Sequence, residues 1–578
     1  MSKKKLITVL IVVVLVIAAL IVIAQVSKKE PLDFTYNHSA TTIAEIETGD
    51  YKGYIKTIEE TVTNPAKVSS QTLEGKDVTG LVRQGYDFDA ETSASTLRTD
   101  GVQDENGALQ EKADGEFIFV NDSGKIVWKI NVPVAGYYNI KLNYRTTTYQ
   151  SKSSSMERKL NVVTSNDDIN AAYNSFMANQ SYVFSRIWEG DTGEIVKDDN
   201  KKIKDTEHYM LSLAKDSAGN DVKPSQKEVI ADVVDFFSDD LGYVTDPYMY
   251  YLTEGENTIE LIAVKEYILI KSIEAAPIDA IPTYEEYLQS YASATNNAPA
   301  DFSYRIEGEA CTATSSPTLY PVTDRTSSMT YPYSAKYTKL NSIGGDNWKV
   351  LGDWISWTIE VPEDGWYNIS LRTRQNLVRG MYSHRMVYID GAIPFEELKS
   401  TVFAFSNDWQ NVTLGSNEDG GSPFKFYLTK GKHEVKFEVT LGVYGELVEE
   451  LEAVTQDLSD LYLNIIKYTT ASPDTNRDYS LNKMEDLHLM DRLQNAYDRL
   501  RVISVQLSRI SSKNGDKEDT KGDGEIYKDG KSDKTGVIDT MVEQLGVFLK
   551  QPSKVTKQLN NFSTNVSSLG TLLSDLRE

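Results

Sequence analysis

The sequence predicts a multidomain chain that is mainly β plus α, with a transmembrane helix first, two β modules in the middle and an antiparallel helical bundle last. Three observations predict this order. An uncharged apolar run lies near the start, one strand–turn–strand pattern occurs twice, and the apolar spacing changes near residue 444 from every second residue to every third or fourth. With 578 residues, of which 40% are hydrophobic and 25% charged, the chain has the composition of several folded domains.

Residues 1–26 are predicted to form a cytoplasmic lysine tip and a membrane anchor. Three lysines precede Leu6–Ala24, an uncharged run that would measure about 28 Å as a helix, close to the thickness of a bilayer core. Lysines on this side predict a cytoplasmic N-terminus and an extracellular bulk, hence a single-pass protein of the cell membrane. A cleaved secretory signal is the alternative, but the long apolar run favours a retained anchor. Residues 27–70 then form a polar spacer with one short helix.

Charge and cysteine content exclude several classes of function. The net charge of −25 repels phosphate backbones, so we expect no nucleic-acid partner. Cys311 is the single cysteine, which excludes a disulfide framework and a cysteine-ligated metal, and the five histidines form no zinc motif. Such a chain outside the membrane fits a bacterial cell surface. No nucleophile-elbow motif occurs and no catalytic constellation stands out, so we expect a protein that is not an enzyme.

An internal duplication defines the two β modules. Val127–Leu142, VWKINVPVAGYYNIKL, aligns without a gap with Ser356–Leu371, SWTIEVPEDGWYNISL, and each predicts two alternating strands around a Pro–Gly turn. A second shared stretch begins at Pro247 in the first copy and at Pro423 in the second. The offsets of the two pairs, 229 and 176 residues, differ by 53, so the first copy holds a large insertion. Insertions of this size usually lie between strands at one end of a sandwich.

These landmarks divide the rest of the chain. Module 1 spans residues 71–275 and includes the insertion, residues 276–300 form a linker with one short helix, and module 2 spans residues 301–445. Residues 446–578 carry apolar residues at helical spacing in about four segments, which predicts the bundle. The last helix stops without a cap, which fits either a frayed end or a fragment of a longer protein.

Module 2 holds two kinds of candidate binding residue. Glu307 and Glu309 lie two positions apart on a predicted strand, so both carboxylates face one side and could hold Ca²⁺; a solvated strand face or pairing with Arg305 or Lys336 is the alternative. Aromatic rings and an amide in predicted loops could stack on and hydrogen-bond to a sugar. These candidates are Trp348, Trp354, Tyr331, Tyr382, Asn376 and Trp409. Structural packing is the alternative for each of them.

Four segments of module 2 together resemble the carbohydrate-binding modules of families 6 and 35. They are EGEA at 307–310, GDWISW at 352–357, VPEDGWYNISLR at 361–372 and YLTKGKHEVKFEV at 427–439. The resemblance implies a β-sandwich with a jelly-roll fold and a structural Ca²⁺ site near Glu307 and Glu309. Module 1 matches only around the two shared stretches and lacks the E-x-E and G-D-W elements. The layout also resembles the N-terminal part of membrane-anchored extracellular solute-binding proteins of sugar ABC transporters, without their two-lobed domain.

The sequence therefore predicts a cell-surface carbohydrate-binding protein without catalysis that belongs to a sugar-uptake system. Its expected partners are a glycan or oligosaccharide, the membrane, and an ABC-transporter permease or other surface protein. Two alternatives stay open. The chain could be a structural stalk that docks another surface protein, or an accessory region of a glycoside hydrolase whose catalytic domain is absent.

Overall fold

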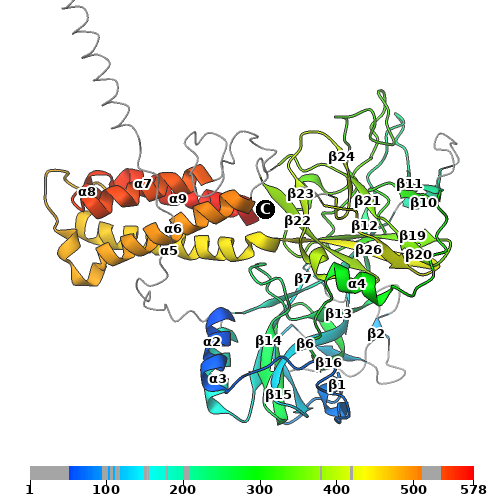
Figure 1. The fold of residues 1–578 in the computed structure, drawn as a ribbon, viewed down its shortest axis with the longest axis horizontal. Helices are drawn as coiled ribbons and strands as arrows, with labels where there is room; N and C mark the ends of the chain where they lie inside the picture. Colours follow the sequence, from blue (N-terminus) through cyan, green and yellow to red (C-terminus); the bar gives the residue numbers. More distant parts are fainter. Residues whose placement is uncertain are drawn as a thin grey trace, which may run out of the picture. The chain divides into compact units, whose positions relative to one another are not determined.

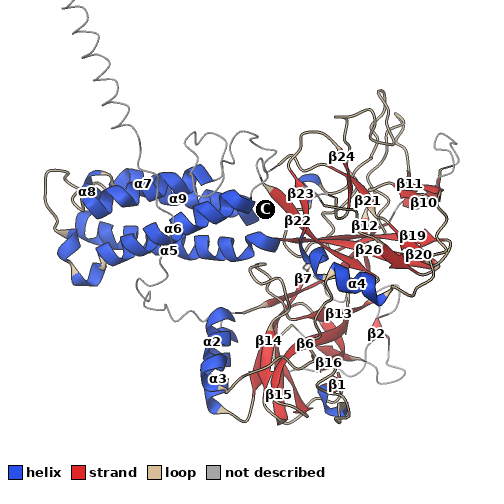
Figure 2. Cartoon of the chain, in the orientation of Figure 1, coloured by secondary structure: helices blue, strands red, loops and turns tan. Residues whose placement is uncertain are grey.

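The computed structural model describes residues 51–93, 102–103, 109–110, 117–120, 122–148, 151, 153, 155–177, 180–191, 193–198, 207–377, 381–416, 421–510 and 535–577. The predicted anchor, residues 6–24, lies outside these ranges. Within them, no helix is long and apolar enough to cross a membrane. The described residues form two compact units, residues 51–455 with 570–577 and residues 456–569. Strands lie in the larger unit and the smaller unit is helical (Figures 1 and 2).

Module 1 is a sandwich of two antiparallel sheets. One sheet has the order β1-β16-β6-β13, with β14 also pairing with β6 and β4 with β16, and the other has the order β5-β15-β7-β8. Alternate side chains of both sheets meet in a closed core, where Trp128, Tyr138 and Tyr144 are fully buried. The strands are β1 (Val82–Gln84), β4 (Ile118–Val120), β5 (Lys125–Val132), β6 (Gly136–Arg145), β7 (Ser155–Val163), β8 (Tyr182–Ser185), β13 (Asp232–Phe236), β14 (Met249–Leu252), β15 (Gly255–Lys265) and β16 (Ile268–Ala276). A separate pair joins β2 (Val102–Gln103) to β3 (Leu109–Gln110).

Module 2 has one continuous antiparallel sheet and two small ones. The continuous sheet contains β18-β19-β26-β22-β23, whereas β20-β25 and β21-β24 are two-stranded sheets. Val387, Phe395 and Phe437 are among the buried residues of its core. The strands are β17 (Tyr304–Ile306), β18 (Ala313–Thr314), β19 (Trp354–Val361), β20 (Gly365–Tyr367), β21 (Ser370–Thr373), β22 (Tyr382–Ile389), β23 (Thr401–Ala404), β24 (Gln410–Thr413), β25 (Phe426–Leu428) and β26 (Gly431–Thr440).

Strands from the insertion of module 1 belong to the sheets of module 2. β9 and β12 extend the continuous sheet to seven strands, because β9 pairs with β18 and β12 with β9. β11 pairs in parallel with β17, and β10 pairs with β11. The bounds are β9 (Ile187–Gly190), β10 (Gly193–Lys197), β11 (Glu207–Leu213) and β12 (Gln226–Val229). Backbone hydrogen bonds therefore join the two modules through this insertion.

A short helix covers an edge strand in the same way in each module. α2 (Tyr51–Thr61) lies in the predicted spacer and packs beside α3 (Asp167–Met177) of module 1. α4 (Tyr284–Ser290) lies in the predicted linker. Two tyrosine hydroxyls of each helix accept hydrogen bonds of 2.8–2.9 Å from backbone N–H groups of the edge: Tyr51 from Met249, Tyr54 from Tyr251, Tyr284 from Lys425 and Tyr287 from Tyr427. Edge strands leave backbone N–H groups without a partner strand, and the tyrosine hydroxyls accept hydrogen bonds from these groups. The duplicated unit thus includes a Tyr-x-x-Tyr helix ahead of each sandwich.

The helices of residues 446–577 form the predicted bundle, which confirms this part of the fold. They are α5 (Gly445–Thr469), α6 (Leu489–Ile510), α7 (Thr535–Lys550), α8 (Lys554–Lys557) and α9 (Leu559–Arg577). Their apolar stripes bury residues such as Leu461, Leu500 and Leu545. A buried hydrogen bond of 2.7 Å from the Ser504 hydroxyl to Asp539 links α6 to α7. Short 3₁₀ helices lie at Thr79–Leu81, Gly345–Asn347, Glu396–Ser400, Gly442–Tyr444, Leu481–Lys483 and Glu485–Leu487.

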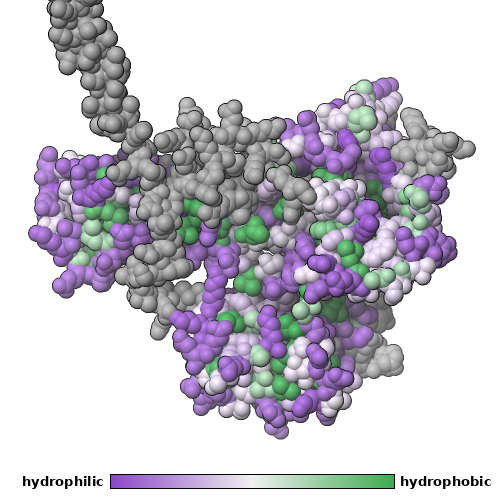
Figure 3. All heavy atoms as spheres, in the orientation of Figure 1, coloured by the Kyte–Doolittle hydropathy of each residue, from purple (hydrophilic) through white to green (hydrophobic). Residues whose placement is uncertain are grey.

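The described surface is mainly hydrophilic on the face drawn in Figure 3. This agrees with the net charge of −25 and the mean hydropathy of −0.40.

Candidate functional site

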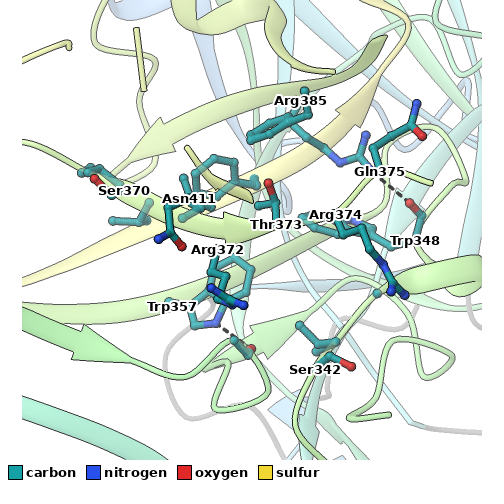
Figure 4. A pocket seen from close by; sticks show the side chains of 18 of the residues that line it. Ser342, Trp348, Trp357, Ser370, Arg372, Thr373, Arg374, Gln375, Arg385 and Asn411 are labelled. Atoms are coloured by element: carbon teal, nitrogen blue, oxygen red, sulfur yellow. Dashed lines mark hydrogen bonds between the residues drawn. The ribbon is translucent and has the colours of Figure 1, made fainter. Parts of the chain in front are cut away.

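Module 2 contains a partly open cavity of about 1650 Å³. Its walls come from β17, β19, β20, β21, β22 and β26 and from the loops beside them. Figure 4 shows how side chains of these strands and loops surround the space. We call the end of module 2 at which β19, β22 and β24 begin and β21 ends the loop end. At the other end lies the Pro362–Gly365 turn.

Five of the six predicted ligand residues line this cavity. They are Tyr331, Trp348, Asn376, Tyr382 and Trp409. Each lies in a loop or at the first residue of a strand, so the fold brings distant parts of the sequence together at the loop end.

Trp354 is the sixth predicted residue, and it does not line the cavity. It lies on β19 an odd number of residues from Trp357, so the two side chains leave opposite faces of the strand. The Lys436 ammonium lies 5.5 Å from the centre of the Trp354 ring.

An Asp–Arg–Trp cluster at the loop end was not identified from the sequence. Arg374 donates to Asp324 at 2.8 Å and to Thr326 at 2.7 Å, and its guanidinium lies 5.2 Å from the Trp409 ring centre. The Trp409 indole N–H donates to Asp324 at 3.3 Å. Burial raises the pKa of Asp324, but hydrogen bonds from Thr326 and Trp409 and the charge of Arg374 outweigh it and hold this pKa below its usual value. The carboxylate is therefore charged at neutral pH.

The sequence held one signal for this cluster. Arg374 lies three residues after the repeated hairpin, at the position that Arg145 has in the first copy. Asp324 lies in the Tyr-, Pro- and Ser-rich loop before it, where sequence spacing does not reveal a partner 50 residues away.

Trp348 forms a second aromatic wall of the cavity. The Arg385 guanidinium lies 4.5 Å from its ring centre and donates to the Trp348 carbonyl at 3.0 Å. The indole N–H of Trp348 donates to the Asp353 carbonyl at 3.1 Å. These contacts fix the orientation of the ring. Burial lowers the pKa of Arg385 to about 10, so it stays cationic.

Two residues of the module 1 insertion contact Tyr331. Its hydroxyl donates to Asp198 at 2.9 Å, and its ring centre lies 5.3 Å from that of His208. The insertion therefore helps to position an aromatic residue of the module 2 cavity.

The loop end combines groups that suit a hydroxyl-rich ligand. Trp348, Trp409 and Tyr331 offer partly buried rings, and Asn376 offers an exposed amide. The Arg374–Asp324 pair supplies charged hydrogen-bond donors and acceptors next to the Trp409 ring. Aromatic faces with a few oriented polar groups are the composition of small-molecule sites.

The predicted metal ligands Glu307 and Glu309 lie in different environments. Glu307 accepts from Arg305 at 2.7 Å and lies 2.6 Å from a ring nitrogen of His208. Glu309 is 2% exposed, and both of its carboxylate oxygens lack a hydrogen-bond partner. Burial raises the pKa of Glu309 well above its usual value.

The fit of a cation to these residues is therefore partial. Glu309 has two buried oxygens that a hard cation would satisfy, whereas Glu307 is already engaged by two basic groups. Among the residues that the structure describes, no group of three or more His, Cys, Asp or Glu side chains is arranged to hold a metal ion.

Comparison with known proteins places one part of the chain in a class. The family model of the bacterial solute-binding protein four-helix bundle domain matches residues 446–578. The C-terminal region is therefore similar to a domain found in bacterial solute-binding proteins. No curated protein matches the chain.

Solved structures show weaker likenesses. A cycloisomaltooligosaccharide glucanotransferase of Paenibacillus sp., complexed with cycloisomaltoheptaose, is 20% identical over 29% of this chain and 22% of that one, with a TM-score of 0.17. A GH26-CBM35 β-(1,4)-mannanase of Podospora anserina is 14% identical over 36% of this chain and 34% of that one, with a TM-score of 0.15. The matches thus span about a fifth and a third of those proteins, and TM-scores this low describe no common overall fold.

Proposed function

We propose that this chain is a non-catalytic carbohydrate-binding protein of the bacterial cell surface and part of the solute-binding component of a sugar ABC transporter. The observation that carries the proposal is the gathering of Trp348, Trp409, Tyr331 and Asn376 on one cavity beside the Arg374–Asp324 pair. The match of residues 446–578 to a domain of bacterial solute-binding proteins supports the uptake role.

Binding takes place at the loop end of module 2, which is a jelly-roll module of the kind that the sequence resembles. A pyranose ring stacks on Trp409, and the contacts of Trp409 with Arg374 and Asp324 fix the orientation of the indole ring. Sugar hydroxyls donate to Asp324 and accept from Arg374 and Asn376. Trp348, held by Arg385, forms the far wall of the site.

A cation and a membrane anchor complete the proposal. Glu309 is the residue that would hold Ca²⁺, because the ion would supply a positive charge to its two buried oxygens, whereas Arg305 and His208 contact the neighbouring Glu307. Residues 6–24 anchor the chain in the membrane, which leaves the modules outside the cell.

A glycan array with the full chain in detergent tests the binding proposal, followed by calorimetry with the best oligosaccharide. We expect retention of at least one oligosaccharide class, lost in Trp409→Ala and weakened in Asn376→Ala. Trp354→Ala is the matched control, because Trp354 is a tryptophan of the same module that does not line the cavity. If no glycan is retained, or if Trp354→Ala and Trp409→Ala weaken binding equally, the proposed site is wrong.

A scaffolding role is the second candidate, and one observation favours it. β9 and β11 of the insertion pair with β18 and β17 of module 2, so the two modules form a joined platform. A pull-down with the full chain in detergent would recover a permease or other surface protein if the platform docks a partner.

A further inference from the structure

The two modules make the same kinds of hydrogen bond around their repeated hairpins. In each, the first tryptophan donates its indole N–H to a glycine carbonyl: Trp128 to Gly85 and Trp357 to Gly308. In each, a tyrosine hydroxyl donates to a carbonyl four residues earlier: Tyr138 to Val134 and Tyr367 to Glu363. β6 of module 1 and β20 with β21 of module 2 therefore occupy equivalent places.

Among the residues that the structure describes, β16 of module 1 has no counterpart in module 2. It follows β15 after a two-residue turn and pairs with β6, β1 and β4, so it lies inside its sheet. β26 is the counterpart of β15, but after it the chain enters α5 instead of returning to the sheet. Among the described residues, no strand takes the place of β16, and β20 and β21 pair on one side only.

The missing strand changes the burial of the repeated core residues. Trp128, Ile130, Tyr138, Ile140 and Leu142 of module 1 are all 0% exposed. Their counterparts Trp357, Ile359, Tyr367, Ile369 and Leu371 are only partly buried, and they line the cavity. The same apolar residues that form a dry core in one copy thus face open space in the other, a state that the hydrophobic effect disfavours.

The open space has the boundaries of a slot for one strand. β17, the counterpart of β1, forms one side, and it uses its other edge to pair with β11. β20 and β21 form the opposite side, and their outer edges pair with β25 and β24. Backbone groups alternate along a strand, so those of Ser370 and Arg372 face the slot while the Ile369 carbonyl accepts from Leu414 on the β24 side.

We propose that this slot binds an extended polypeptide strand that completes the sheet of module 2. The strand runs antiparallel to β21, as β16 runs antiparallel to β6, and its backbone pairs with Ser370 and Arg372. Alternate apolar side chains point inward to cover Trp357, Ile359 and Leu371, as Ile270, Ile273 and Ala275 of β16 cover the core of module 1.

The strand enters from the loop end and is attached to α9. A strand antiparallel to β21 must begin where β21 ends, which is the loop end. Asp575, Leu576 and Arg577 of α9 line the same cavity, and they belong to the same compact unit as module 2. Arg577 pairs there with Glu452 at 2.7 Å and with the Tyr243 hydroxyl. The end of α9 is thus held beside the entrance of the slot.

The slot and the proposed sugar site are two parts of the same cavity. The slot is lined by the inward side chains of β19, β20 and β21, whereas the sugar-binding residues lie at the loop end. A filled slot leaves the Asp324–Arg374–Trp409 cluster in place.

Strand addition can be tested by extending the full chain after Glu578. One variant carries a short Gly–Ser linker followed by the β16 sequence ILIKSIEAA, and its control carries the same extension with the Ile, Leu and Ala residues replaced by Ser. A third sample contains the unextended chain with an equimolar free ILIKSIEAA peptide. Amide hydrogen exchange of residues 366–373 is measured in each, in detergent, at micromolar protein.

We expect the apolar extension alone to slow exchange of these amides at least tenfold. The free peptide stays without effect at this concentration, because only the tethered strand gains effective concentration. Unchanged exchange with the apolar extension, or equal slowing by the serine control, would overturn the slot. Slowing by the free peptide to the same extent would overturn the attachment to α9. Glycan retention by the same samples reports on the sugar site independently.

Discussion

Modules 1 and 2 share a hairpin, a Tyr-x-x-Tyr helix and a hydrogen bond from a tryptophan indole to a glycine carbonyl, yet the core of module 1 is closed and that of module 2 is open. Module 1 keeps β16 and buries the repeated apolar residues completely. Module 2 sends the chain into α5 at the equivalent point and retains a cavity of about 1650 Å³. Among the described residues, module 2 thus has no strand equivalent to β16, and its repeated apolar residues face an accessible space instead of a closed core.

Arg145 of module 1 and Arg374 of module 2 occupy equivalent positions of the repeat but have different partners. Arg145 of module 1 pairs with Asp232 on the neighbouring strand at 2.5 Å. In module 2, Trp409 directly precedes β24, the counterpart of β13, and Arg374 reaches instead to Asp324 in a loop. A structural ion pair in one copy thus corresponds to a candidate ligand-binding cluster in the other.

The largest expected difference between the modules concerns core truncation. Leu142→Ala should cost about 2–5 kcal/mol, because Leu142 is fully buried and its removal leaves a cavity. Leu371→Ala should cost about 1 kcal/mol or less, because its side chain already faces open space. Denaturant unfolding followed by hydrogen exchange in each module measures both. Equal losses would contradict the open core of module 2.

The second prediction concerns the paired arginines. Arg374→Gln should weaken oligosaccharide binding about tenfold or more, because it removes a charged donor and the partner of Asp324. Arg145→Gln is the matched control in module 1 and should leave affinity unchanged. Calorimetry with the best array ligand gives both affinities, and a thermal melt checks that each variant is folded. Loss of affinity in the Arg145 variant would refute the assignment to module 2.

The third prediction is a pH dependence carried by Glu309, which corresponds in module 1 to Tyr86, the residue after Gly85. Burial raises the pKa of Glu309, so its contribution to stability is fully present below the unfolded pKa near 4.5 and is lost as pH rises. In the presence of a chelator, Glu309→Gln should therefore melt higher than the parent chain at pH 7 and equally at pH 4.

The same two proteins can be compared in the presence of Ca²⁺ instead of a chelator. If Glu309 holds the ion, Ca²⁺ should raise the melting temperature of the parent chain at pH 7 and leave that of Glu309→Gln unchanged. A calcium effect of the same size in both proteins would remove Glu309 from the metal site.

The smallest predicted effect is one that the modules share. Tyr54→Phe and Tyr287→Phe each remove the hydroxyl that accepts a backbone N–H of an edge strand, at a cost of about 1 kcal/mol. Hydrogen exchange at Tyr251 and Tyr427 should rise by similar factors in the two variants. A large effect in one module alone would show that the two helices do not play equivalent roles.

Sequence reasoning recovered much of the candidate site and missed its connections. Trp348, Trp409 and Asn376 could be named because loop aromatics and amides are recognisable by type and position. Asp324 and Arg374 could not be paired, because they are 50 residues apart and meet only through the fold. Trp354 is also predicted from the sequence to bind sugar, but its place on β19 turns its side chain away from the cavity.

The two β modules and the helical bundle could be predicted from the sequence, because apolar periodicity and an internal repeat can be read directly along the chain. The 53-residue excess of the first copy could be predicted in the same way. The fold was needed to show that β9, β10, β11 and β12 of the insertion lie in the sheets of module 2. The fold also shows that, among the described residues, no strand pairs with the second edge of β21. Strand pairing depends on segments far apart in sequence, and identical apolar patterns are compatible with a closed or an open core.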